Sequence, residues 1–240
     1  KEEDKAPLQR QQELLTEYPL MAEIKHPYRL LVIGKAQSGK TTMAVKAIEY
    51  LIPQVEEVYV ASPTYEFQPT WGPIRKSVTL YHDSPEAVFN ALKKAISNSI
   101  GDEENKIGEK VPVKRLLVCD DVSYEKAMNQ GNKGLFNGFA FNATWWNLSR
   151  VVIVHKTSNV GAGIKENCEG LLLFNVMHKE YKNLFDTFGI VKNFKAMNQL
   201  MRLFIISKIE SGEDRHPFLF IDLKNGGKLY FKMREQLILE

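Results

Sequence analysis

Short runs of apolar residues recur along the chain, each bounded by polar residues, glycine or proline. The runs lie at residues 30–33, 55–61, 113–121, 151–154 and 171–175, with a weaker run at 77–82. Continuous apolar runs of this length are typical of strands that are buried on both faces, as in a parallel sheet. The pattern therefore predicts a central, mainly parallel sheet built from these segments.

The segments between the predicted strands carry apolar residues at helical spacing. The clearest stripe follows the first strand, where Pro53 then ends the helix: Met43, Ala44, Ala47, Ile48, Leu51 and Ile52. A second helix is expected to begin at Ser84 and Pro85, which suit the N-cap and the first helical position. Less regular segments are predicted as a charged loop at 100–111, a turn at 130–134 and a helix at 135–143.

The two ends of the chain depart from this alternation. Residues 1–27 are polar, and we expect either an arm that packs on the domain or on a neighbouring subunit, or a frayed terminus. Towards the other end, helices are predicted at 181–188 and 194–201, followed by a segment at 202–209 rich in β-formers. Residues 218–223 and 228–233 flank an Asn225-Gly226 turn and predict a β-hairpin.

Together these elements predict an α/β fold with a mainly parallel central sheet, flanking helices and a C-terminal β-hairpin. We divide the chain into an N-terminal arm at 1–27, a core at 28–176, and C-terminal helices and hairpin at 177–240 that pack on the core. A hydrophobic content of 44% supports a sizeable core, and no apolar stretch is long enough to predict a membrane span.

Net charge and cysteine content place only weak limits on the partners and the cellular compartment of the protein. A net charge of +3 permits contact with nucleic acid without arguing for it. Two cysteines, Cys119 and Cys168, do not suit a disulfide framework and favour a reducing compartment.

The joint between the first strand and its helix carries the strongest chemical signal. It matches G-x-x-x-x-G-K-[ST], the phosphate-binding loop, in the strand–loop–helix context that the motif requires. Glycines let successive backbone N–H groups face one anion, and the helix N-terminus adds partial positive charge. Lys40 is expected to reach the phosphates of ATP, and the Thr41 hydroxyl to bind Mg²⁺. The predicted nucleotide-binding residues are Gly34, Lys35, Ala36, Gln37, Ser38, Gly39, Lys40, Thr41 and Thr42.

A pair of carboxylates forms the second candidate site. The apolar run Leu116–Cys119 ends in Asp120 and Asp121, which is the arrangement of a Walker B strand. Asp120 is then a Mg²⁺ ligand, through the water shell of the ion, and Asp121 is placed to polarise the attacking water. The alternative is that the two aspartates cap the turn that follows the strand.

Two further features have competing interpretations. His155 follows the strand at 151–154, and a polar residue at that position can sense the γ-phosphate. The alternative interpretation is that His155 has only a structural role. Tyr65, Phe67 and Trp71 lie in a loop after the second strand, and we expect them to pack over the rim of the sheet rather than to touch nucleotide or DNA bases.

The order of these motifs favours an ATPase of the additional-strand, RecA-like type. The sequence lacks the cluster of lid arginines that is typical of small-molecule kinases. It also lacks the N-K-x-D motif with which GTPases recognise the base. At this level the sequence resembles the genome-packaging ATPases of large DNA viruses and virophages, of the poxvirus type, in the FtsK–HerA superfamily. The resemblance spans about residues 28–175 and rests on five stretches: GKAQSGKTT, VYVASPT followed by Trp71, LLVCDD, NLSRVVIVH and IKENCEGLLLFN.

The resemblance implies an ATP- and Mg²⁺-dependent motor that moves double-stranded DNA into a preformed capsid. It implies a homo-oligomeric ring, pentameric or hexameric, that docks on a capsid or portal-vertex protein. The expected location is the host cytoplasm or a viral factory, with association to the virion. The alternatives are a helicase or recombinase-type ATPase, and a nucleotide-gated assembly protein without turnover.

The sequence departs from the family pattern at two places. The sensor position, usually glutamine in the family, is occupied by His155. An Arg-His pair often precedes the sensor strand, and Thr144 and Trp145 stand at the matching positions. Arg150 is therefore our candidate for the arginine that acts on a neighbouring subunit's nucleotide, and the alternative is an ordinary surface ion pair for Arg150.

Overall fold

A single sheet of nine strands organises the computed structural model, which describes residues 7–103, 113–121 and 145–238. The strand order is β3-β2-β4-β5-β1-β6-β7-β8-β9. The strands are β1 (Arg29–Ile33), β2 (Glu57–Ala61), β3 (Leu80–His82), β4 (Arg115–Asp120), β5 (Leu148–Val154), β6 (Gly170–Leu173), β7 (Leu219–Asp222), β8 (Lys228–Phe231) and β9 (Glu235–Leu237).

The first six strands pair in parallel, and the last three join them antiparallel to their neighbours. The predicted parallel core and the C-terminal hairpin are therefore confirmed. The hairpin of β7 and β8 is a continuation of the main sheet, because β7 pairs directly with β6.

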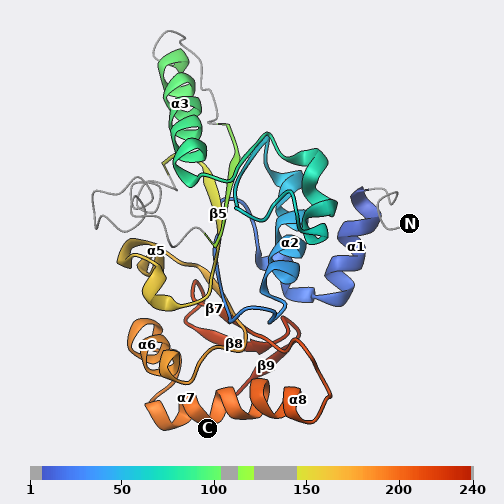
Figure 1. Cartoon of the computed structure of the whole chain (residues 1–240), viewed down its shortest axis with the longest axis vertical. Helices are drawn as coiled ribbons and strands as arrows, with labels where there is room; N and C mark the ends of the chain where they lie inside the picture. The colour runs from blue at the N-terminus through green and yellow to red at the C-terminus, as the bar shows by residue number, and fades with distance from the viewer. Residues whose placement is uncertain (1–6, 104–112, 122–144, 239–240) are drawn as a thin grey trace.

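Helices cover both faces of the sheet (Figure 1). On one face lies α2 (Lys40–Leu51), with the N-terminal α1 (Pro7–Glu17) outside it and a 3₁₀ segment at Pro69–Ser77. On the other face lie α3 (Pro85–Glu103), α5 (Ala162–Glu166) and α6 (Lys179–Phe188). Below them, α7 (Phe194–Met201) continues through a π-helical stretch at Arg202–Ile206 into α8 (Ser207–Glu210).

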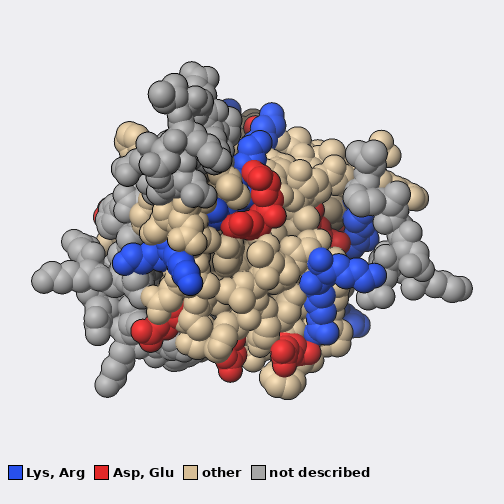
Figure 2. Space-filling view, turned by 90° about the horizontal axis from the view of Figure 1, so that it is seen from above, with Lys and Arg blue, Asp and Glu red and all other residues tan. Residues whose placement is uncertain are grey.

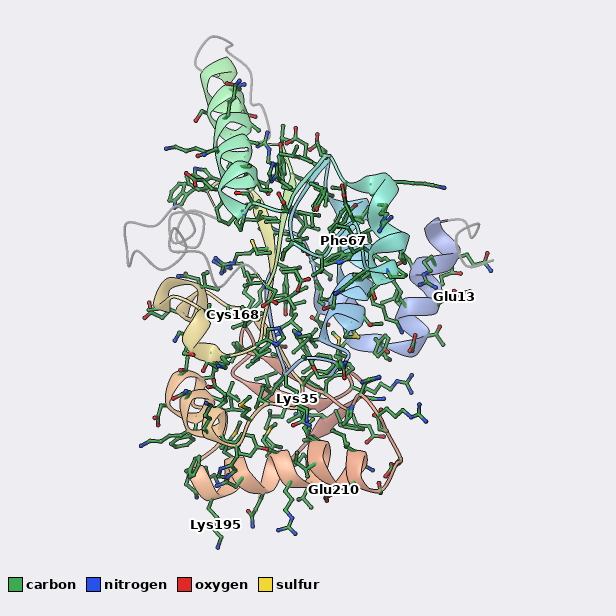
Figure 3. The ribbon with its side chains drawn as sticks, in the orientation of Figure 1. Glu13, Lys35, Phe67, Cys168, Lys195 and Glu210 are labelled. Atoms are coloured by element: carbon green, nitrogen blue, oxygen red, sulfur yellow. The ribbon has the colours of Figure 1, made fainter. Side chains whose placement is uncertain are left out.

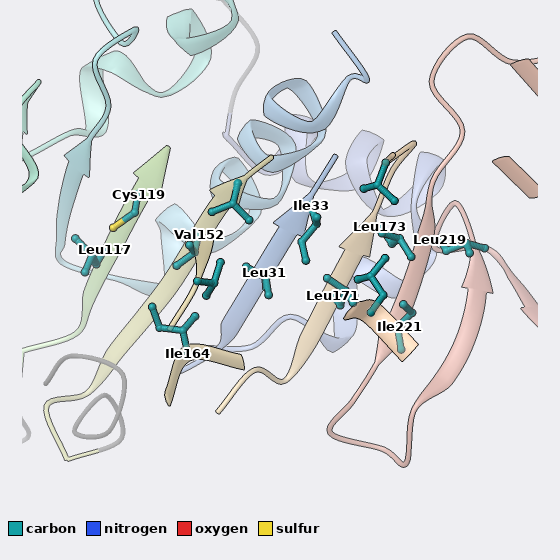
Figure 4. Close-up of a cluster of buried hydrophobic side chains, with 14 of the residues drawn as sticks. Leu31, Ile33, Leu117, Cys119, Val152, Ile164, Leu171, Leu173, Leu219 and Ile221 are labelled. Atoms are coloured by element: carbon teal, nitrogen blue, oxygen red, sulfur yellow. The ribbon is translucent and has the colours of Figure 1, made fainter. Parts of the chain in front are cut away.

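Alternation along each strand divides the apolar side chains between two cores. Leu30 and Val32 face the α2 side, whereas Leu31 and Ile33 face the α3–α5–α6 side. Figure 4 shows the second core, to which the adjacent strands β4, β5, β1, β6 and β7 each contribute apolar side chains. Each fully buried aliphatic residue of this kind stabilises the fold by about 1.5–3 kcal/mol, so the sheet forms a rigid platform for the loops at its edge.

From residue 7 onward the N-terminal arm packs on the domain, which confirms the expectation of a packed arm rather than a frayed terminus. Leu14 is buried, and Arg10 Nε and Lys46 Nζ form ion pairs with Glu49 at 3.2 Å and Glu17 at 2.9 Å, respectively. Because these pairs join α1 to α2, the arm from residue 7 onward rests on the helix that follows the phosphate loop.

Several boundaries differ from the prediction. Residues 202–209, rich in β-formers, are helical because Met201, Ile205 and Ile209 recur every four residues and pack on one core. The loop predicted from residue 100 begins later, since α3 continues to Glu103. The rest of that loop, the turn at 130–134 and the helix at 135–143 lie outside the described residues.

Charged side chains are interspersed on the face seen in Figure 2, where lysine and arginine alternate with aspartate and glutamate. Within the described part of the chain, no helix is both long enough and apolar enough to pass through a membrane.

Candidate nucleotide-binding site

The carboxyl ends of β4, β5, β1 and β6 meet at one edge of the sheet, because these four neighbours run parallel. Backbone hydrogen bonds fix the start of the phosphate loop between the flanking strands. Gly34 N donates to Val154 O at 3.2 Å, and Lys35 N donates to Asn175 O at 2.8 Å. The loop at residues 34–39 is thereby held over the centre of the sheet edge, and Lys35 marks it in Figure 3.

Two glycines allow the loop to fold as it does. A Cβ on Gly34 would lie 2.5 Å from Ser38 Oγ and 2.7 Å from Phe174 Cβ, so any side chain there would collide with the loop itself. Gly39 has a φ of 87° and directly precedes α2, in a backbone conformation that side chains disfavour. The loop therefore requires glycine at both positions of the motif.

The loop suits a bound polyphosphate. The N-terminal N–H groups of α2 and its dipole face an anion, since Lys40 is the first helical residue. Ser38 Oγ is buried and has no hydrogen-bond partner among the described residues, which a phosphate oxygen would supply. Ser38 and Lys40 are buried, and Gly39 and Thr41 are partly buried. The exposed residues of the motif are Lys35, Ala36, Gln37 and Thr42.

Lys40 faces the two carboxylates across the loop. Its side chain is 7% exposed, and burial lowers the pKa of the ammonium, while the charges of Asp120 and Asp121 raise that pKa. The structure thus brings together the cation and the acidic pair that the sequence predicted for one site.

Asp120 ends β4 and is held by hydroxyl groups from the loop that follows the neighbouring strand β2. Burial raises the pKa of Asp120 to about 6, although the nearby Lys40 charge lowers that pKa. Ser62 Oγ and Thr64 Oγ1 both donate to Asp120 Oδ2, at 3.3 and 3.4 Å. A buried carboxylate in this setting is stabilised in its charged form by a further cation, which fits a role in binding Mg²⁺.

Ser62 and Thr64 were assigned no role in the site from the sequence, although both lie in the VYVASPT stretch that carries the family resemblance. The signal lay in the pairing of β2 with β4, since Ala61 stands opposite Cys119 and so sets Ser62 beside Asp120. In the same loop Tyr65 and Trp71 are buried and pack on the sheet as predicted, whereas Phe67 is 82% exposed.

Asp121 pairs with His155 at the end of the adjacent strand. Asp121 Oδ2 lies 3.3 Å from His155 Nε2, and the Asp121 backbone N donates to Ile153 O at 3.1 Å. Asp121 Oδ1 is buried without a hydrogen-bond partner in the described part of the chain, and the residue has a φ of 52°. A carboxylate with one oxygen paired and one available is suited to orient a water molecule.

Mg²⁺ is expected to need few protein ligands here. Within the described residues no group of three or more His, Cys, Asp or Glu side chains could hold a metal ion. Mg²⁺ is usually bound by one or two protein groups together with phosphate oxygens and water. Thr41, the second residue of α2, and Asp120, the last residue of β4, are side chains of the kind that this arrangement requires.

Comparison with known proteins places the chain in a family. The sequence profile described as "Poxvirus A32 protein" matches residues 17–216, which include every residue of the site. The chain belongs to the Poxvirus A32 protein family. A comparison with curated proteins finds no match.

Solved structures match this member of the Poxvirus A32 family over most of its length. The genome packaging NTPase B204 from Sulfolobus turreted icosahedral virus 2, in complex with ATPγS, has a TM-score of 0.57 and 11% identity over 89% of this chain and 98% of that chain. B204 from Sulfolobus turreted icosahedral virus, a DNA-packaging ATPase, has a TM-score of 0.57 and 12% identity, with coverage of 90% and 100%. The pCW3 conjugation coupling protein TcpA has a TM-score of 0.55 and 16% identity, over 82% of this chain and 57% of that chain. At such identities the likeness establishes the fold, and the predicted fold class is confirmed.

Arg150 is not an arginine that can act on a neighbouring subunit, and that prediction is wrong. The strand β5 begins at Leu148, so Arg150 lies within the strand between Leu117 and Arg29 rather than before it. Its side chain is 1% exposed, and burial lowers the pKa of the guanidinium to about 10. Nη2 donates to Ile164 O at 3.5 Å, so the side chain points into the core under α5 and cannot form the alternative surface ion pair either.

The other departure from the family pattern is only partly described. Trp145 is 85% exposed, and Thr144 lies outside the described residues. His155 directly follows β5, and its Nε2 lies 3.3 Å from Asp121 Oδ2; its role as the sensor residue stays a prediction.

Proposed function

We propose that this member of the Poxvirus A32 family is a Mg²⁺-dependent ATPase that moves double-stranded DNA into a preformed viral capsid. The observation that carries the proposal is the convergence of Lys40, Asp120 and the Asp121–His155 pair on one phosphate loop. Family membership and the likeness to structures described as genome packaging enzymes support the same assignment.

Each side chain has a role that its surroundings permit. Bound MgATP supplies the γ-phosphoryl group and the cation that neutralises its oxygens. Lys40 places a buried positive charge beside the phosphates, and Thr41 and Asp120 hold Mg²⁺. Asp121 Oδ1 accepts a hydrogen bond from the attacking water, while Oδ2 stays with His155 Nε2.

Replacing Asp121 by asparagine should preserve MgATP binding and slow turnover by about 10²–10⁴-fold, since the water loses its anionic acceptor. Binding is measured with ATPγS and turnover by phosphate release. Asp186→Asn, an exposed aspartate on α6, is the matched control. Full activity of the Asp121 variant, or a loss of MgATP binding equal to that of an Asp120 variant, would remove this division of roles.

A buried contact links the site to the C-terminal helices. Thr157 N and Oγ1 both donate to Glu180 Oε2, at 3.1 and 2.7 Å, and both residues are almost fully buried. Thr157 lies two residues after His155, and Glu180 is on α6. We infer that a displacement of His155 on loss of the γ-phosphate is passed to α6, which gives the motor a route from hydrolysis to movement.

The ring, the DNA and the docking partner are part of the proposal. Charge that spreads over the γ-phosphoryl oxygens is usually met by an arginine, often from a neighbouring subunit, and Arg150 is excluded from that role. A ring of five or six subunits would supply such an arginine from another position. DNA contact is expected to be electrostatic and independent of sequence, as a motor that moves any genome requires. A capsid or portal-vertex protein would hold the ring, in the host cytoplasm or a viral factory and at the virion.

A triplex-displacement assay tests translocation, because a motor that tracks along duplex DNA removes a third strand bound to it. We expect ATP-dependent displacement without separation of the duplex strands. Strand separation would favour the helicase or recombinase-type alternative. ATP binding without hydrolysis would favour the nucleotide-gated assembly protein.

A further inference from the structure

The segment between α8 and β7 lies against the phosphate loop. A Cβ placed on Gly39 would lie 2.9 Å from His216 Cβ, 3.0 Å from His216 Cγ and 3.3 Å from His216 Nδ1. The imidazole therefore stands directly beside the residue at which the loop turns into α2. No element of the parallel core makes this contact; it comes from the C-terminal part of the chain.

Two anchors hold this segment, residues 211–217, in place. Asp214 Oδ1 accepts a hydrogen bond from His216 N at 3.0 Å, and Asp214 also pairs with Lys232, which directly follows β8. On the far side, Phe218 is buried with its ring centroid 5.1 Å from that of Phe174, whose Cβ abuts Gly34. The segment thus contacts the phosphate loop directly at Gly39, and Phe218 packs on the Phe174 ring next to Gly34, so the position of His216 is set by the fold.

The imidazole itself has no structural partner. His216 is exposed, and its ring makes no hydrogen bond, ion pair or ring contact within the described residues. An aromatic ring fixed by its backbone, with two polar nitrogens left to solvent, has the properties of a ligand-binding group.

The site described above lacks a group for one part of the nucleotide. Lys40, Ser38 and the loop N–H groups serve the phosphates, and Thr41 and Asp120 serve Mg²⁺. None of these groups recognises the base or the ribose. An imidazole can stack on a base or exchange hydrogen bonds with a ribose hydroxyl.

We propose that His216 binds the nucleoside part of ATP within its own subunit. The proposal rests on the proposed function, since it requires that ATP occupies the phosphate loop. It makes the C-terminal segment part of the nucleotide site, although the motifs lie entirely in the core.

The test compares two ligands, MgATPγS and magnesium tripolyphosphate, which share the phosphates and differ in the nucleoside. His216→Ala should weaken ATPγS binding by about tenfold or more, the effect of losing one stacked or hydrogen-bonded ring, and change tripolyphosphate binding by less than about twofold. His216→Phe, which keeps a ring, should restore most of the ATPγS affinity if stacking dominates. His178→Ala, at the N-cap of α6, where the imidazole contacts Asn198 Oδ1 at 3.1 Å, is the control and should bind both ligands as the wild type does.

Unchanged ATPγS affinity in His216→Ala would overturn the inference, and so would an equal loss for both ligands, which would assign His216 to the phosphates or to the shape of the loop. Thermal melting of each variant identifies a loss that comes from unfolding, and tripolyphosphate affinity that matches the wild type shows that the phosphate loop is intact in the variant. Wild-type protein that binds tripolyphosphate but not ATPγS would contradict the proposed function itself, and this inference with it.

Discussion

Alanine in place of Lys40 should abolish ATP hydrolysis and weaken ATP binding by about 10- to 150-fold, which corresponds to losing charged hydrogen bonds of about 1.5–3 kcal/mol in total. Lys40 is 7% exposed and is the cation that the loop holds against the phosphates. Its removal also leaves Asp120 and Asp121 without the positive charge that faces them, so the phosphates would meet two uncompensated carboxylates.

Lys46→Ala is the matched control for this variant. Lys46 lies on the same helix, but its ammonium group pairs with Glu17 of α1, at 2.9 Å, on the side away from the loop. Phosphate release and ATPγS titration of both variants give the comparison. Hydrolysis at the wild-type rate in the Lys40 variant would refute the assignment of the loop.

The second large effect is expected for Asp120→Asn, which should lower hydrolysis by several orders of magnitude and raise the Mg²⁺ concentration required. The amide keeps the shape of the side chain and can still interact with the Ser62 and Thr64 hydroxyls, but it carries no charge for the cation. Because burial raises the pKa of Asp120 to about 6, keeping this carboxylate charged costs free energy, which a bound Mg²⁺ would offset.

Mg²⁺ titrations of the ATPase rate separate this effect from a general loss of structure. The Asp120 variant should show a higher half-saturating Mg²⁺ concentration, whereas Asp121→Asn should keep the wild-type value and lose turnover. An Asp120 variant with the wild-type Mg²⁺ dependence would mean that the carboxylate has only a structural role at the end of β4.

The phosphate loop could be predicted from the sequence because all its determinants are local. The apolar strand, the glycines and the helix are contiguous, and the structure only adds the contacts at Gly34 and Gly39. The Walker B strand could be predicted for the same reason, since an apolar run that ends in acidic residues is a pattern within one segment.

The partners of these residues depend on which strands are neighbours, and a single sequence does not contain that order. Ser62 meets Asp120 because β2 lies beside β4, and His155 meets Asp121 because β4 lies beside β5. The contact of His216 with Gly39 requires the hairpin to join the sheet at β6, which the hairpin pattern alone did not indicate.

Arg150 illustrates a different error. The apolar run at 151–154 predicts a strand that begins after Arg150, and the choice of Arg150 depended on that position before the sensor strand. The strand extends over Leu148 and Ser149 as well, so that Arg150 takes the same face of the sheet as Val152 and lies in the core. One misplaced strand boundary thus turned a buried side chain into a candidate for the subunit interface.

The most direct test of the whole account is the rate of phosphate release by the wild-type protein with MgATP, measured with and without double-stranded DNA of arbitrary sequence. We predict Mg²⁺-dependent hydrolysis that rises several-fold on addition of duplex DNA and is lost in Lys40→Ala. Hydrolysis that duplex DNA leaves unchanged at every protein concentration, or no hydrolysis by protein that binds ATP, would contradict a DNA-packaging motor.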